Sequence, residues 1–175
     1  PNWLSLSFRV GDGEWFDLRA VRLLEYRQEL DLRRGMLLRR VLFEDGAGRR
    51  TALDERRFVS MADMHLAGLE LALTAQNWSG DVTVRSALDG RVVNDGAALY
   101  RPFDNRHLEP VACGSAGDEG IYLVVRTNQS DLRVAVAART RVFVRGEGID
   151  ALPQRIEQRR YVAEELSIRL SRGET

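Results

Sequence analysis

The chain has 175 residues, with 26 acidic and 26 basic side chains, so its formal net charge is zero. This length suits one domain with a sizeable core, and zero net charge argues against a nucleic-acid partner. Cys113 is the only cysteine, which excludes an internal disulfide. No apolar run approaches the roughly 18 residues of a membrane span and no signal sequence opens the chain, so we expect a cytoplasmic protein without membrane contact.

Short alternating segments separated by turn residues dominate the first half of the chain. The turn residues Gly11-Asp12-Gly13 come first, and residues 22–33 then alternate acids with arginines. That alternation is typical of an ion-paired, solvated sheet face. A second turn signal follows at 45–48, leucines then alternate with small residues over 69–73, and residues 82–88 alternate in the same way. Each run predicts a half-buried antiparallel strand.

The second half resumes this pattern after a long interruption. Alternation returns at 132–136, a turn is predicted at Gly146-Glu147-Gly148, and 165–171 alternate again. Residues 152–166 are the nearest helical candidate, but their apolar side chains make no clear stripe, so strands are favoured there too. We predict about ten strands and no helix, in a single all-β domain over 1–175 built as an antiparallel β-sandwich.

The interruption itself runs from Gly90 to Gly120 and is dense in polar groups. Connections longer than about 15 residues are uncommon in compact domains and usually carry function or are disordered. Apolar residues such as Val92, Val93 and Leu108 favour a segment packed on a scaffold over a disordered one. This stretch is therefore the predicted functional loop.

The loop places planar hydrogen-bonding groups beside aromatic ones, a combination that sugar sites use. The opposite interpretation is that the same groups tie the loop to its own sheet. The candidates for facing a sugar are Asp89, Arg91, Asn94 and His107, with Tyr100 and Arg106 as further members of the set.

Catalytic and metal-binding patterns are not found. The sequence lacks GxSxG, HExxH, CxxC and a phosphate-binding loop. Cys113 has no adjacent cation that would lower its pKa, and His65 precedes an apolar run as an ordinary strand-edge or packed histidine would. No catalytic residue, metal or cofactor is assigned to this chain.

Several motifs, taken together and in order, resemble the N-terminal domain of glycoside hydrolase family 65, which includes maltose, trehalose and kojibiose phosphorylases and related hydrolases. The resemblance spans Pro1 to about Leu170. It rests on the runs PNWL at 1–4, GDGEWF at 11–16, LDLRRG at 30–35, RFVSMAD at 57–63, NWSG at 77–80, SALDGRVVN at 86–94 and NRHLEP at 105–110.

This resemblance implies a β-sandwich of the supersandwich, galactose-mutarotase-like type, followed in the parent protein by an (α/α)6 barrel. The barrel would hold the general acid and would invert the anomeric carbon, with inorganic phosphate as co-substrate of a phosphorylase and water as that of a hydrolase. The implied substrate is an α-linked glucose disaccharide of the trehalose or maltose type. This chain alone is expected to be inactive, and the implied partners are the barrel and the disaccharide.

The chain starts later than the family pattern and stops before the barrel, so we expect a fragment truncated on its N-terminal side. A sheet without its first strands leaves open backbone edges, which favours a homodimer. Two alternatives to a pocket-shaping domain stay open: an independent carbohydrate-binding module and a purely structural domain for dimerisation and support.

Overall fold

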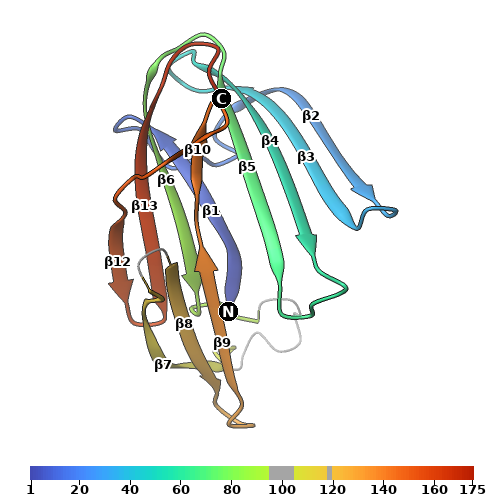
Figure 1. The fold of residues 1–175 in the computed structure, drawn as a ribbon, viewed down its shortest axis with the longest axis vertical. Coiled ribbons are helices and arrows are strands. Elements are labelled where there is room, and N and C mark those ends of the chain that lie inside the picture. Colours follow the sequence, from blue (N-terminus) through green and yellow to red (C-terminus); the bar gives the residue numbers. More distant parts are fainter. Residues whose placement is uncertain (95–104, 118–119) are drawn as a thin grey trace. The chain divides into compact units, whose positions relative to one another are not determined.

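The computed structural model describes residues 1–94, 105–117 and 120–175. These residues form antiparallel strands and no helix, which confirms the predicted all-β sandwich class (Figure 1). The strands are β1 (Asn2–Val10), β2 (Arg22–Asp31), β3 (Met36–Glu44), β4 (Arg50–Val59), β5 (Ala67–Ala75), β6 (Gly80–Asp89), β7 (Leu108–Ser115), β8 (Gly120–Thr127), β9 (Arg133–Arg139), β10 (Val142–Val144), β11 (Glu147–Ile149), β12 (Gln154–Gln158) and β13 (Tyr161–Leu170).

The described strands pair into sheets of order β1-β6-β13-β12, β2-β3-β4-β5, β7-β8-β9 and β10-β11. By contacts the chain groups into two compact units, and β1, β6, β10, β11 and β13 contribute residues to both. The first unit comprises 1–8, 83–142 and 148–167, and the second comprises 9–82, 143–147 and 168–175.

The second unit is built around the meander β2-β3-β4-β5. Its register places Val41 opposite Leu53 and Leu53 opposite Leu73, and all three side chains are buried. Period-2 alternation puts these apolar residues on one face and the charged Arg40 and Asp54 on the other. The β3–β4 turn closes through Asp45, whose Oδ1 accepts hydrogen bonds from the backbone N–H groups of Ala47 (2.9 Å) and Arg49 (3.0 Å).

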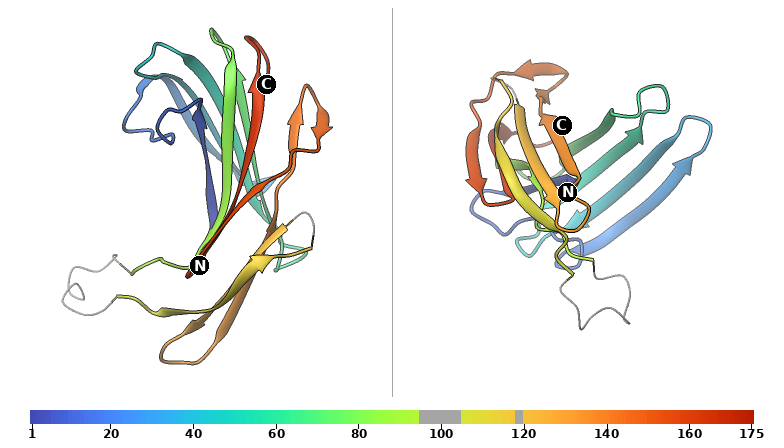
Figure 2. Two further views of the ribbon diagram at one scale, coloured as in Figure 1. Left: turned by 90° about the vertical axis from the view of Figure 1, so that its left-hand side faces the viewer. Right: turned by 90° about the horizontal axis from the view of Figure 1, so that it is seen from below.

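The first unit contains the sheet β7-β8-β9, whose strands lie side by side in both views of Figure 2. Its core joins Ile121, Leu123 and Val125 of β8 to Leu88 of β6 and Val162 of β13. Because β6 and β13 both contribute to this core, the C-terminal end of β6 is anchored in it. The connection that follows β6 therefore begins at a fixed position.

The predicted loop from Gly90 to Gly120 is too long, because β7 occupies Leu108–Ser115. The sequence pattern of a strand is not recognisable here because of Pro110 and the small residues around it. Proline is depleted in strands and is tolerated at bulges. The β7–β8 register shifts between Pro110 and Ala112, which is where such an irregularity lets a proline fit. The connection between β6 and β7 therefore covers 90–107, of which 95–104 lie outside the described residues.

The segment 152–166 contains no helix and holds β12 and the start of β13. The hairpin between them turns at Arg160, whose φ of 65° is left-handed. Arginine is not a typical residue for that conformation. The turn therefore carried no sequence signal, which explains the helical alternative considered for this segment.

Candidate functional site

The β6–β7 connection begins at Gly90, whose backbone is locked in place. Its N–H donates a 2.7 Å hydrogen bond to the carbonyl of Arg160, and the residue is buried. A Cβ at this position would lie 2.8 Å from Val125 Cγ1 and 3.3 Å from Leu123 Cδ2. Glycine is therefore required by close approach to the core, and the connection leaves the sheet at a fixed point.

Asp89 and Arg91 flank this point and bind each other. The Arg91 guanidinium donates to both carboxylate oxygens of Asp89 at 2.9 Å, and the Arg91 backbone N–H donates to Oδ1 at 2.8 Å. The guanidinium also lies over the ring of Tyr161, 4.1 Å from its centroid. Such a bidentate pair stacked on an aromatic ring fixes the arginine in one geometry.

The pKa of Asp89 reflects the same contacts. Burial alone would raise it, but the hydrogen bonds from the Arg91 side chain and backbone, with the positive charges of Arg91 and Arg160, lower the pKa below its usual value. The carboxylate therefore stays ionised near neutral pH. Asp89 is thus suited to hold Arg91 and unsuited to act as a general acid.

The other two predicted residues lie further along the two arms of the connection. The backbone N–H of Asn94 donates to the carbonyl of Asn105 at 3.1 Å, so the arms pair with each other there. The carbonyl of His107 accepts from the backbone N–H of Asn128 at 3.1 Å, which ties the returning arm to the β8–β9 turn. Asn94 is exposed and His107 is half-buried.

The structure thus brings Asp89 and Arg91 together. Among the described residues, no hydrogen bond joins this pair to Asn94 or His107. Tyr100, a further member of the predicted set, lies outside the described residues. Tyr161, Arg160 and Asn128 were missed as partners of the loop, because contacts over such sequence separations leave no pattern in the chain itself.

Cys113 behaves as predicted for a structural cysteine. Its Sγ lies 3.5 Å from the carbonyl of Gln158, and burial, with a further contribution from the negative charge of Glu157, raises the pKa of the thiol. In the described ranges, no group of three or more His, Cys, Asp or Glu side chains is placed to hold a metal. His65 is exposed in the β4–β5 loop, two residues before β5, which agrees with the strand-edge interpretation and not with the packed one.

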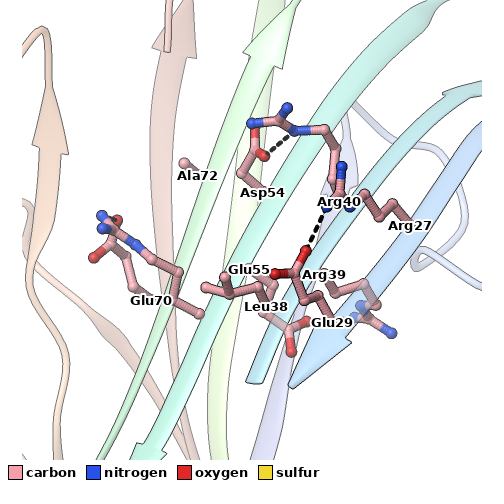
Figure 3. Close-up of a pocket in the computed structure, with 10 residues that line it drawn as sticks. Arg27, Glu29, Leu38, Arg39, Arg40, Asp54, Glu55, Glu70 and Ala72 are labelled. Atoms are coloured by element: carbon pink, nitrogen blue, oxygen red, sulfur yellow. Dashed lines mark hydrogen bonds and ion pairs between the residues drawn. The ribbon is translucent and has the colours of Figure 1, made fainter. Parts of the chain in front are cut away.

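The charged face of β2-β3-β4-β5 forms a hollow of about 390 Å³ (Figure 3). Ion pairs join Arg27 to Glu29 at 2.6 Å and Arg40 to Asp54 at 2.7 Å, and a third joins Arg56 to Glu70. This confirms the ion-paired sheet face predicted from the alternating charges. The carboxylates of Glu29, Asp54 and Glu70 in this hollow thus already have arginine partners within the same sheet.

Comparison with known protein families decides the assignment. The whole chain, residues 1–175, matches the family described as "Glycosyl hydrolase family 65, N-terminal domain". The chain belongs to this family. The resemblance inferred from the motifs is thereby confirmed.

Three relatives illustrate this family 65 membership. The chain is 37% identical over its full length to an uncharacterized glycosyl hydrolase of Mycobacterium tuberculosis (strain H37Rv), covering 13% of that protein. It is 32% identical over 81% of its length to the kojibiose phosphorylase of Thermoanaerobacter brockii, covering 18% of it. It is 35% identical over 72% of its length to the alpha,alpha-trehalose phosphorylase of the same organism, covering 17% of it.

The family 65 domain thus spans less than a fifth of the length of these relatives. No helix that is long and apolar enough to cross a membrane occurs among the residues that the structure describes. The assignment to one cellular compartment, the homodimer and the sugar contacts stay predictions.

Proposed function

We propose that this chain is the noncatalytic N-terminal domain of an inverting phosphorylase or hydrolase acting on an α-linked glucose disaccharide of the trehalose or maltose type. The observation that carries the proposal is the family match over all 175 residues, together with relatives named as kojibiose and trehalose phosphorylases. The domain supports the catalytic barrel, and its β6–β7 connection helps to shape the sugar pocket.

The geometry at the root of the connection supports this role. A side chain at Gly90 would displace buried side chains, and Arg91, which is bound to Asp89, lies over the ring of Tyr161. A rigid base of this kind presents a loop in one orientation, which positioning at an active site requires. Asp89 and Arg91 therefore act as positioning residues, because their polar groups are already bound to each other.

Asn94 and His107 are the residues proposed to reach the sugar. Among the described residues, no hydrogen bond engages either side chain. An amide and an imidazole both donate and accept hydrogen bonds, so each can bind a sugar hydroxyl. Bond cleavage itself is assigned to the barrel, where a carboxylic acid protonates the leaving oxygen and phosphate or water attacks from the opposite face.

The proposal is tested by kinetics of the longer protein. Asn94→Ala and His107→Ala should each lower kcat/KM roughly tenfold, because one hydrogen bond to an uncharged sugar is worth about 1 kcal/mol or slightly more. Gln129→Ala, an exposed change in the β8–β9 turn, is the matched control. Equal thermal stability of the three variants shows that the effect is local, and unchanged kinetics in both loop variants would refute the contact with substrate.

A further inference from the structure

The turn between β12 and β13 has a backbone conformation that its residues do not favour. Gln158 pairs with Tyr161 across the hairpin, so Arg159 and Arg160 form the turn. The backbone of Arg160 is left-handed, with a φ of 65°. Residues other than glycine adopt this conformation at a cost in free energy, and it persists where the surrounding contacts fix it. We therefore expect Arg160 to make contacts outside its own hairpin.

The backbone of Arg160 holds the point at which the β6–β7 connection begins. Its carbonyl accepts the 2.7 Å hydrogen bond from the N–H of Gly90. The same carbonyl oxygen would lie 3.3 Å from a Cβ at position 90, so the two backbones approach closely here. Arg91 in turn lies over the ring of Tyr161. The outgoing arm of the connection, residues 90–94, is thus bound to two successive residues of the hairpin.

The side chain of Arg160 holds the point at which the connection ends. Its Nη1 donates to the carbonyl of Leu108, the first residue of β7, at 3.3 Å. Further along β7, the Sγ of Cys113 lies 3.5 Å from the carbonyl of Gln158, so the hairpin contacts this strand a second time. The returning arm, residues 105–107, therefore enters β7 at a position that Arg160 fixes.

One residue thus contacts both ends of the connection, through its carbonyl at the start and through its guanidinium at the end. We propose that Arg160 is a positioning residue, which sets the separation of the two arms and, through them, the placement of Asn94 and His107. This inference rests on the proposed function, in which these two side chains reach the sugar. Arg160 is itself half-buried and its guanidinium is bound to the backbone, so it acts through the arms.

The two side chains proposed to reach the sugar lie close to the points that Arg160 holds. His107 immediately precedes Leu108, and Asn94 is the last described residue of the outgoing arm. The backbone N–H of Asn94 donates to the carbonyl of Asn105 at 3.1 Å, so the arms are paired with each other there. A hydrogen bond weakens steeply when its distance or angle changes. Loss of the bond from Arg160 to Leu108 should therefore loosen this pair.

Hydrogen exchange tests the positioning without any sugar. Arg160→Asn removes the bond to Leu108 and keeps the carbonyl that binds Gly90, since asparagine tolerates a left-handed backbone. In the longer protein, the amide of Asn94 should exchange roughly tenfold faster in this variant, because its bond to Asn105 opens more often. Arg159→Asn is the matched control, because it removes the same charge from the exposed neighbour in the same turn. Unchanged exchange at Asn94 in Arg160→Asn would overturn the proposal.

Arg160→Gly gives a second measurement that does not depend on how the first variant folds. Glycine adopts a left-handed turn without strain, so the hairpin should stay intact while the side chain is lost. The amide of Asn94 should then exchange as fast as it does in Arg160→Asn. Protection equal to that of the unchanged protein would show that the guanidinium does not hold the arms.

Kinetics of the longer protein separate positioning from a general loss of stability. A variant that merely unfolds in part loses active protein, which lowers the apparent kcat at unchanged KM. Loosened arms should instead raise KM about fivefold in Arg160→Asn with kcat nearly unchanged, because they bind the sugar less well. When Asn94→Ala and His107→Ala are already present, the same change should raise KM less than about twofold, since no contact is left to position. A full effect in that background would contradict positioning.

Failure of this inference is distinguishable from failure of the proposed function. If Asn94→Ala and His107→Ala leave the kinetics unchanged, the sugar contact is wrong. The exchange of the Asn94 amide still decides whether Arg160 holds the two arms, because that measurement involves no substrate.

Discussion

Replacing Gly90 by alanine tests whether the root of the β6–β7 connection is as tightly fixed as its contacts indicate. The added Cβ would lie 2.8 Å from Val125 Cγ1, whereas two carbon atoms ordinarily approach to about 3.5–4.0 Å. Val125 is fully buried and Leu123, the next neighbour, is 1% exposed, so neither can move into solvent. Overpacking of this kind costs about 1–3 kcal/mol, and the lower entropy of the unfolded alanine chain returns about 0.4–1 kcal/mol.

The expected net loss is about 1–2 kcal/mol, equivalent to a melting temperature lower by roughly 2–8 °C for a chain of this size. Thermal and urea unfolding of the 175-residue chain, followed by far-ultraviolet circular dichroism, measure it. Gly46→Ala is the control, because nothing lies within 4 Å of the added Cβ there. If the two variants unfold together, the close packing at Gly90 is wrong.

Two further predictions follow from the same region. Asp89→Asn should lower stability at pH 7 by about 1 kcal/mol. Because the folded pKa of Asp89 is lowered, the stability that it contributes is present above the unfolded pKa near 3.9 and is lost as pH falls through the folded value. In urea unfolding, the stabilities of the two proteins should therefore converge as pH falls below the unfolded pKa. Calorimetry of the 175-residue chain with trehalose, maltose and kojibiose should show no binding heat. The reason is that the Tyr161 ring is buried and one of its faces is covered by Arg91, so it cannot stack on a sugar ring. Measurable affinity would instead support an independent carbohydrate-binding module.

Strands whose two faces differ in polarity were predictable from sequence. In β3 the charged Arg40 precedes the buried Val41, and in β4 the charged Asp54 follows the buried Leu53, so neighbouring residues face opposite sides of the sheet. The ion-paired face was predictable for the same reason. The alternation of polar and apolar residues reflects which face of a strand meets water. It can therefore be recognised in the sequence without knowing which strands pair.

β7 and the β12–β13 hairpin were harder to predict, since the propensities of their residues disfavour the conformations that they adopt. Pro110 is tolerated in β7 because it lies at a bulge, and Arg160 adopts a left-handed conformation at a turn without glycine or asparagine. Both are tertiary effects that override local propensity. Sequence therefore predicted the polar loop but placed its end too late.

The candidate site was predictable only in part. Asp89 and Arg91 are two residues apart, and their proximity in sequence predicts an interaction. Tyr161 and the carbonyl of Arg160 are some seventy positions away, and only the pairing of β6 with β13 in one sheet brings them near. The sequence thus indicated which side chains could form hydrogen bonds to a sugar. The fold showed that two of them, Asp89 and Arg91, are bound to each other.

The strands shared between the two compact units limit how this chain can be divided. The boundaries between the units fall after Phe8, Val82, Val142, Glu147 and Ser167, and all five of these positions lie inside or at the end of a strand. A protease or a gene rearrangement that separated the units would have to cut β1, β6 and β13 within their ladders. The two units are therefore expected to be transferred together in gene rearrangements and in engineered fusions. Insertions should be tolerated in the loops and not at the boundaries between the units.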